Sequence, residues 1–295
     1  AMERDNLTVM TGALVHRVRF DGKRATGVEV EHKGRMQTID AGEVILSGGA
    51  INSPQLLQLS GIGPREWLDE LNIPVVADRA GVGRNLQDHL QQRAIYKVHN
   101  VKTLNTIYHS LLGRAGMGLE YLLFRRGPLT MAPSQLGAFT RSSPDRQYPN
   151  IQYHVQPLSL DAFGEPLHAF NAFTASVCNL NPTSRGTVSL KSGNFADAPA
   201  IAPHYLSTPE DQKVAADSLR VTRRIAEQPS FMQYQPEEFK PGQQYQTHHE
   251  LAKLAGDLGT TIFHPVGTNR MGPSEYELAP VDPDLRVRGA AVLRA

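Results

Sequence analysis

The first fifty residues carry the pattern that most limits how this chain can fold, an alternation of apolar and polar side chains with a period of two. Valine alternates with glutamate over residues 25–31, which is typical of a β-strand with one buried face. Asp21 and Gly22 supply a tight turn that would pair this strand with residues 14–20. Residues 36–39 would add a third strand, so the sequence predicts an antiparallel meander over residues 14–39.

After the meander, the apolar side chains no longer alternate with a period of two. Residues 43–46 form a short apolar run, typical of a strand covered on both faces, and two glycines follow at 48–49. Ser53 has the character of an N-cap with Pro54 at the first helical position, and Gly61 would end the helix. The glycine turn would let a flat or anionic group approach the backbone before the helix. A plain strand-to-helix turn has the same pattern, so both interpretations stay open.

Further along the chain, the pattern of apolar residues changes again. Apolar residues recur at helical intervals over 103–125, and short strand-like runs alternate with proline and serine loops over 128–192. Thr208 and Pro209 then begin a helix with a cap, a proline at its first position and two acidic residues in its first turn, and Pro229 ends it. These residues predict a second, mostly antiparallel domain with helices.

Charge and cysteine content exclude several classes of protein. The 295 residues include 30 basic and 29 acidic side chains, for a formal net charge of +1, so no overall field draws the chain to nucleic acid or to an anionic membrane surface. Apolar runs such as 121–124 are far shorter than the roughly 20 residues that span a bilayer. The one cysteine, Cys178, cannot form an internal disulfide or a zinc site with several thiolates, and it fits a reducing compartment.

His264 is the histidine that the local sequence constrains most. Pro265 restricts its backbone to an extended conformation, and Gly267 and Gly272 permit turns beyond it. Such a histidine can serve catalysis or only the structure, and spacing alone leaves both open. The eleven histidines show no spacing typical of metal ligands, so we expect no metal.

Two of these segments resemble a known family, the glucose-methanol-choline (GMC) flavoprotein oxidoreductases. Residues 49–63 match its second signature position by position, and residues 264–272 resemble the segment that carries its catalytic histidine. Residues 81–89 and 181–186 resemble further landmarks, in the family's order. The resemblance spans nearly the whole chain and is closest to the choline dehydrogenase-like and alcohol dehydrogenase branch.

The resemblance implies an FAD-dependent enzyme that oxidises an alcohol by hydride transfer to flavin N5. His264 would take the hydroxyl proton or stabilise the alkoxide, a task that suits an imidazole with a pKa of about 6.5. The family's chain contacts the adenine end of FAD through its backbone at the position of Val15. The other positions that the resemblance implies near the cofactor are Gly49, Ala50, Asn52 and Ser53, with Asn85 and Asp88 as weaker candidates.

The resemblance also implies the fold. We expect an α/β chain (α+β overall), with an incomplete FAD-binding Rossmann-like domain and an inserted substrate domain built on an antiparallel sheet with helices. The expected limits are 1–95 and 260–295 for the FAD-binding part and 96–259 for the substrate domain. The family's glycine fingerprint and second catalytic residue would lie outside this sequence, so we expect these residues alone to be inactive.

One position, Gln135, predicts the class of substrate. Residues 134–139 resemble the segment in which choline-oxidising relatives carry a glutamate for the trimethylammonium group, and Gln135 stands in that place. A neutral amide favours an uncharged primary alcohol, with choline as the alternative. A non-redox hydroxynitrile lyase that keeps the flavin and an inactive fragment stay open as other classes. The sequence does not decide among oxygen, a quinone and a cytochrome as electron acceptor, and the expected location is cytoplasmic or peripheral to the inner membrane.

Overall fold

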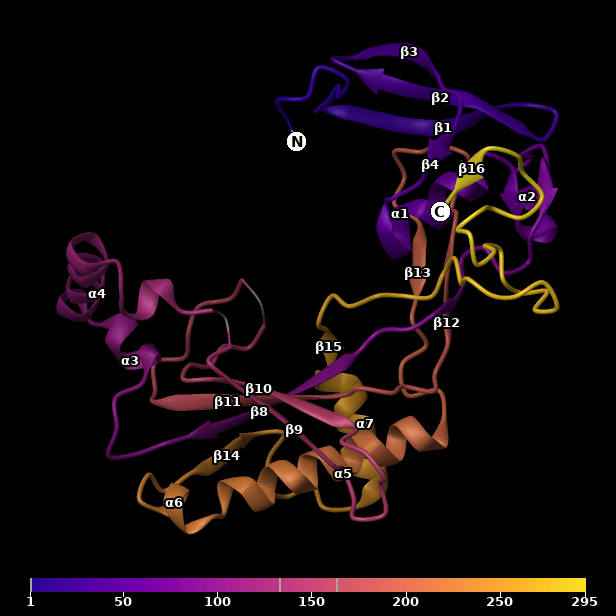
Figure 1. The fold of residues 1–295 in the computed structure, drawn as a ribbon. Coiled ribbons are helices and arrows are strands. Elements are labelled where there is room, and N and C mark those ends of the chain that lie inside the picture. Colours follow the sequence, from indigo (N-terminus) through magenta and orange to yellow (C-terminus); the bar gives the residue numbers. More distant parts are fainter. Residues whose placement is uncertain (1, 133, 163) are drawn as a thin grey trace. The chain divides into compact units, whose positions relative to one another are not determined.

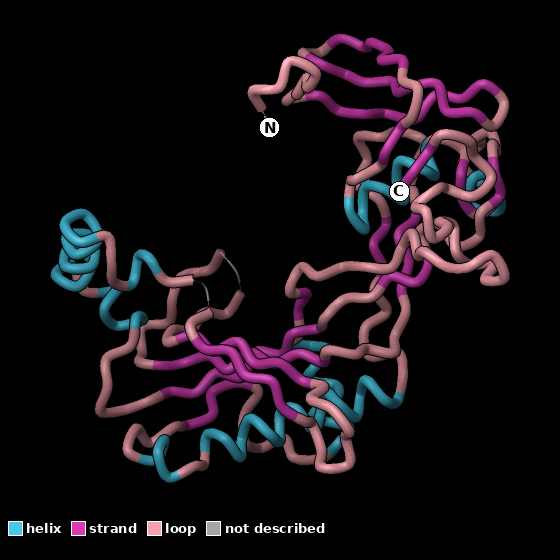
Figure 2. Tube along the Cα trace, viewed as in Figure 1, coloured by secondary structure: helices cyan, strands magenta, loops and turns pink. Residues whose placement is uncertain are grey.

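The computed structural model describes residues 2–132, 134–162 and 164–295, and the chain divides into two compact units (Figures 1 and 2). Unit 1 consists of Ala1–Gln87, Arg185–His204 and Pro265–Ala295, and unit 2 of Asp88–Ser184 and Tyr205–His264. The mixed α/β class expected from the sequence is confirmed, and so is the antiparallel sheet with covering helices. The domain limits expected from the resemblance stay a prediction.

The meander predicted at the start of the chain is present in unit 1. Strands β1 (Ala13–Asp21), β2 (Arg24–His32) and β3 (Arg35–Asp40) form an antiparallel sheet in that order. Val18 lies opposite Val28, and Val18 is buried in the core of the unit because the period-two pattern turns it to the covered face. The turn that joins β1 to β2 is formed by Gly22 and Lys23, one residue later than predicted, because Asp21 still pairs with Arg24.

The remaining strands of unit 1 are short. Two parallel pairs join β4 (Val44–Ile45) to β16 (Leu293–Arg294) and β5 (Ile62–Gly63) to β6 (Ala77–Asp78). A third sheet has the order β13 (Ala200–Ala202), β12 (Gly186–Ser189) and β7 (Arg84–Leu86). Helices α1 (Gly49–Leu59) and α2 (Arg65–Glu70) complete the unit, and its core includes Leu57, Ile62, Val82 and Leu293.

Helix α1 begins at Gly49, so the prediction of an N-cap at Ser53 is wrong. Pro54 lies inside the helix, where it cannot donate the backbone hydrogen bond that the carbonyl of Ala50, four residues earlier, would accept. The buried hydroxyl of Thr268 donates to that carbonyl at 2.6 Å instead. The Ser53 hydroxyl accepts from the Gly48 backbone N at 2.9 Å, from within the helix. A tertiary contact that cannot be predicted from the local sequence therefore lets the helix start one turn earlier than predicted.

Unit 2 is built on a six-stranded antiparallel sheet. The order is β14 (Glu237–Lys240), β8 (Leu90–Lys97), β11 (Ala172–Asn179), β10 (Ile151–Gln156) and β9 (Leu136–Thr140), and β15 (Thr260–Thr261) also pairs with β8. Helices α5 (Pro209–Ala226) and α7 (His248–Leu258) pack on one face through residues such as Tyr96 and Tyr153 (Figure 1). His154 lies between two residues of that face, so it points to the opposite one.

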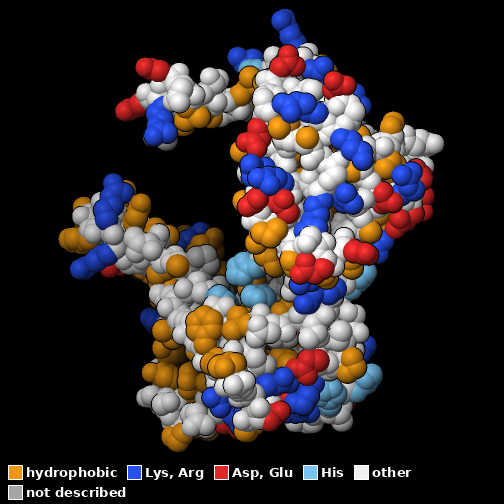
Figure 3. Space-filling view, turned by 45° about the vertical axis from the view of Figure 1, so that its right-hand side comes forward, with side chains coloured by type: hydrophobic (Ala, Val, Ile, Leu, Met, Phe, Trp, Pro, Cys, Tyr) orange, Lys and Arg blue, Asp and Glu red, His pale blue; other side chains and the backbone are white. Residues whose placement is uncertain are grey.

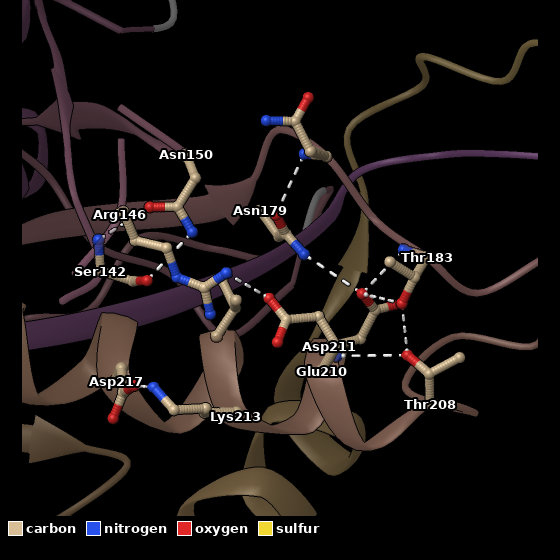
Figure 4. Close-up of polar contacts among 12 residues, drawn as sticks. Ser142, Arg146, Asn150, Asn179, Thr183, Thr208, Glu210, Asp211, Lys213 and Asp217 are labelled. Atoms are coloured by element: carbon tan, nitrogen blue, oxygen red, sulfur yellow. Dashed lines mark hydrogen bonds and ion pairs between the residues drawn. The ribbon is translucent and has the colours of Figure 1, made fainter. Parts of the chain in front are cut away.

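The first turn of α5 holds the loop that precedes it in the unit. Thr208 caps the helix, as predicted, by accepting from the backbone N of Asp211. The Asp211 carboxylate accepts hydrogen bonds from the backbone N–H of Thr183 at 2.8 Å and from the Asn179 amide at 3.3 Å (Figure 4). It also accepts one from the backbone N–H of Ser184 at 2.8 Å. Burial alone would raise the pKa of Asp211, but the hydrogen bonds from Ser184 and Thr183 outweigh it and lower that pKa.

The other elements of unit 2 are helices. Helices α3 (Leu104–His109) and α4 (Leu111–Phe124) and the 3-10 helix η1 (Pro128–Thr130) lie between β8 and β9 in the sequence, and α6 (Pro229–Met232) follows α5. In the described part of the chain, no helix combines the length and the apolar character needed to cross a membrane. Nor do the described residues bring three or more potential ligands together around a metal position.

Candidate active site

The buried carboxylate of Asp88 organises the surroundings of His264 in unit 2. Strand β15 pairs with the start of β8, with Thr261 opposite Leu90, and this pairing brings residues 260–264 beside Asp88. The carboxylate accepts hydrogen bonds from the hydroxyls of Tyr205 and Thr261 and from the backbone N of His264 at 3.0 Å. Asp88 is only 8% exposed, so its charge is balanced by these donors, and the backbone of His264 is fixed.

Three imidazoles lie near one another in unit 2. His89 directly follows Asp88, and its ring packs edge-on against that of His264 with 5.5 Å between centroids. His154, in the middle of β10, is electrostatically coupled to both. The His264 side chain is exposed, whereas His89 and His154 are half-buried. In each of these two a ring nitrogen, Nδ1 of His89 and Nε2 of His154, is buried without a hydrogen-bond partner among the described residues.

Burial lowers the pKa of two members of the histidine cluster, which consists of His89, His154 and His264. Burial and then the nearness of His264 lower the pKa of His89. Burial, His264 and His89, in that order, lower the pKa of His154. Both residues are therefore neutral near pH 7. Burial and the hydrogen bond to Asp88 raise the pKa of Tyr205, which keeps its hydroxyl a donor.

The residues after His264 belong to unit 1, where they pack against the glycine loop that the sequence singled out. Val266 and Gln87 exchange two backbone hydrogen bonds, both at 2.9 Å, and Gly83 N donates to the Thr268 carbonyl at 2.8 Å. Asn85 Nδ2 donates to a carbonyl of the same segment at 3.1 Å. Through the Thr268 hydroxyl this segment also contacts α1. Three of the motifs identified in the sequence thus meet within unit 1.

Some residues of unit 1 fit a bound cofactor. Gly49 has a φ of +71° and no neighbouring atom within 4 Å of the position of a Cβ, so the turn before α1 is open on that side. The helix has no side-chain cap and no acidic residue in its first turn, which leaves its N-terminus suited to an anionic or polar group. Both polar atoms of the Asn269 amide are buried without a hydrogen-bond partner among the described residues.

The other predicted cofactor residues differ in what they can still bind. Asn52 is exposed and Ala50 half-buried, whereas Ser53 is buried. Val15 is half-buried in β1, opposite Val30. Both polar atoms of the Asn85 side chain are hydrogen-bonded. Its Nδ2 donates to the Gly267 carbonyl, and its Oδ1 accepts from the Arg185 Nε, each at 3.1 Å.

Gln135 lies elsewhere in unit 2. It is exposed just before β9 and lines an apolar cavity of about 230 Å³ together with Leu136, Val155 and Phe173. The described residues that line this cavity include none of the histidine cluster. Gln135 and the histidine cluster thus do not line this cavity together.

Sequence reasoning missed several residues of this region. They are His89, His154, Tyr205, Thr261, Thr268 and Asn269. The alternation in residues 151–155 could have found His154, because it turns this residue to the face opposite Tyr153. No local pattern marks Tyr205, which reaches Asp88 from 117 residues away.

Comparisons with known proteins agree on one family. The two family models described as GMC oxidoreductase match residues 1–91 and 182–295. An alcohol dehydrogenase [acceptor] of Pseudomonas putida is 39% identical over 99% of this chain and 53% of its own length. An oxygen-dependent choline dehydrogenase of Staphylococcus haemolyticus is 38% identical over the whole chain and 52% of its own length. The chain thus spans about half the length of these curated relatives.

A solved structure gives the same result for the fold. An FAD-dependent oxidoreductase from Chaetomium thermophilum superposes with a TM-score of 0.86 and 25% identity, over 99% of this chain and 57% of that one. The cofactor to which the family and this structure point is FAD.

Proposed function

Because the chain belongs to the GMC oxidoreductase family, we propose that it forms part of an FAD-dependent enzyme that oxidises a primary, uncharged alcohol to the aldehyde. His264 would receive the hydroxyl proton. The observation that carries this proposal is the contrast between the backbone of His264, which is hydrogen-bonded to the buried Asp88, and its side chain, which is exposed. A fixed backbone and an accessible imidazole suit a general base.

The two neighbouring histidines support this role. Because burial and His264 lower the pKa values of His89 and His154, both stay neutral when His264 accepts a proton. Neutral neighbours leave the new charge to His264. Asp88 acts as a positioning residue in this proposal, because its oxygens are occupied by Tyr205, Thr261 and the His264 backbone.

The cofactor would be held by residues of unit 1. FAD supplies the acceptor for the hydride that leaves the alcohol carbon. We assign the open turn at Gly49 and the uncapped first turn of α1, with Ala50 and Asn52, to contacts with it. The unpartnered amide of Asn269 is a further candidate, whereas Ser53 is buried and bonded to the turn itself. The assignments of Val15 and Asn85 rest on the resemblance.

The preference for an uncharged alcohol rests on the carboxylates near the histidine cluster. A quaternary ammonium group is bound by a free carboxylate or by aromatic faces. Asp88, the carboxylate beside these histidines, already accepts three hydrogen bonds, and Gln135 is neutral. The relatives do not decide the question, because the alcohol and choline dehydrogenases match this chain at 39% and 38% identity.

Anaerobic mixing of the complete FAD-loaded enzyme with neutral primary alcohols and with choline tests the proposal. The wild type should bleach the flavin faster with the neutral alcohols. His264→Ala should slow the bleaching by about 10²- to 10⁴-fold. His248→Ala, at the exposed start of α7, is the matched control and should leave the rate unchanged.

Three results would contradict the proposal. An unchanged rate in His264→Ala would exclude this residue as the base. A flavin that stays oxidised with every alcohol would point to the non-redox lyase. A clear preference for choline would show that the binding site for the charged group lies away from Asp88 and Gln135.

A further inference from the structure

Helix α4 presents an apolar surface that the described residues of its own unit leave exposed. It contributes no buried side chain. Five leucines at positions 111, 112, 119, 122 and 123 are between 57% and 86% exposed. With Ala115 they occupy one continuous arc of the helix surface, because successive residues turn by about 100°. We call this surface the α4 leucine face.

The opposite side of α4 is the one that contacts the protein. Gly113, Met117, Gly118 and Tyr121 are half-buried, and a Cβ on Gly113 would collide with the Ile107 carbonyl of α3. The orientation of α4 is therefore set by packing, and the leucines point outward as a result. An outward face without a polar side chain marks an interaction site in a folded protein.

Basic residues border the α4 leucine face. Residues 101–130 include four lysine or arginine side chains and one acidic side chain, Glu120. The guanidinium groups of Arg114, Arg125 and Arg126 lie over the rings of Tyr108, Tyr121 and Phe124 at 5.8, 5.1 and 5.0 Å. Hydrophobic and basic side chains accordingly occur together on the space-filling surface (Figure 3). The local excess of positive charge contrasts with a net charge of +1 for the whole chain.

We propose that the α4 leucine face docks this protein on an anionic lipid surface, with α4 lying parallel to the membrane plane. A 14-residue helix is about 21 Å long and cannot cross a hydrocarbon core of about 30 Å. Leucines that enter the acyl region, with arginines and aromatic rings at the headgroup level, are typical of an interfacial helix. This inference does not depend on the proposed reaction.

The charges favour lipid over a second copy of the chain. A symmetric dimer through this face would place the same arginines of both copies near one another, and like charges across an interface are unfavourable. An anionic headgroup layer pairs with Arg114 and Arg125, and it competes with Glu120 for Arg126, whose Nε donates to that carboxylate at 3.2 Å.

Vesicle flotation of the complete enzyme and of these 295 residues tests the proposal. We expect binding to vesicles of phosphatidylcholine and phosphatidylglycerol in equal parts. Leu112→Ser combined with Leu119→Ser should lower the partition coefficient about a hundredfold. The control pair Met36→Ser and Ile39→Ser removes two exposed apolar side chains from β3 and should leave the partition coefficient unchanged.

A separate variant tests the contribution of the arginine charges to vesicle binding. Arg125→Gln combined with Arg126→Gln should weaken binding to the mixed vesicles roughly thirtyfold and leave the weaker binding to phosphatidylcholine alone unchanged. Circular dichroism confirms that each variant is folded.

Three results would overturn the proposal. One is equal vesicle binding by the wild type and the leucine variant. The second is a dimer that the leucine variant dissociates without any vesicle binding, which would assign the face to a second copy. The third is binding by the 295 residues that is absent in the complete enzyme, which would show that other parts of the polypeptide cover the face.

Discussion

Replacing Asp211 by alanine tests whether the 179–184 loop is held by one buried carboxylate. Asp211 is 4% exposed at the third position of α5 and accepts the backbone N–H groups of Thr183 and Ser184 at 2.8 Å each. The alanine variant removes this acceptor while the loop and the helix stay packed together. The free energy of unfolding should fall, because buried donors that lose their acceptor are costly.

The magnitude follows from the two backbone hydrogen bonds. A hydrogen bond to a charged acceptor contributes about 1.5 kcal/mol, so the two together contribute roughly 3 kcal/mol. The bonds from the Asn179 amide and the Thr183 hydroxyl add little, because these side chains can rotate toward other partners. Asp217→Ala removes a carboxylate from the same helix that pairs with Lys213 and Arg220, and it should cost only about 0.5 kcal/mol.

Urea unfolding followed by circular dichroism compares the two variants with the wild type. The pKa of Asp211 is lowered in the folded chain, so its contribution is complete above the unfolded value of about 3.9 and is lost as the pH falls through the folded value. The difference between wild type and Asp211→Ala should therefore be full at neutral pH and shrink below about pH 4. Equal losses in the two variants, or a difference that grows on acidification, would refute the reasoning.

Two further substitutions test the contacts around the histidine segment. Thr268→Val should cost about 1 kcal/mol of unfolding free energy, since the Ala50 carbonyl loses its donor. The cost should nearly vanish in a Pro54→Ala background, where the helix supplies an N–H, and equal costs in both backgrounds would contradict this account. Asp88→Ala should slow flavin reduction in the complete enzyme about a hundredfold, because the backbone of His264 is released. Stopped-flow measurements that show a raised KM with unchanged kcat would argue against that positioning role.

The elements that the sequence predicted well are those whose signals are local. The meander follows from period-two alternation and a two-residue turn, and the start of α5 follows from Thr208 and Pro209. In each case the residues that predict the element lie within the element itself. Short-range patterns were therefore sufficient for these parts of the fold.

The elements that the sequence did not predict depend on distant partners. The start of α1 was misplaced because Thr268, 218 residues away, provides the hydrogen bond that Pro54 cannot. The histidine cluster has the same origin, since the pairing of β15 with β8 joins residues more than 160 positions apart in the sequence. Neither contact can be predicted from the residues that neighbour it in the sequence.

Hydrogen bonds show which residues of the family-like motifs stabilise the fold and which have side chains available for chemistry. In the 181–186 motif, Thr183 and Ser184 donate to Asp211, so this landmark is explained by stability. In the 264–272 motif, Thr268 is buried and bonded to Ala50, whereas His264 is held through its backbone and leaves its imidazole exposed. A match to a family motif does not distinguish these cases. The accessible imidazole on a fixed backbone is what makes His264, rather than its neighbours, the residue on which the proposed oxidation depends.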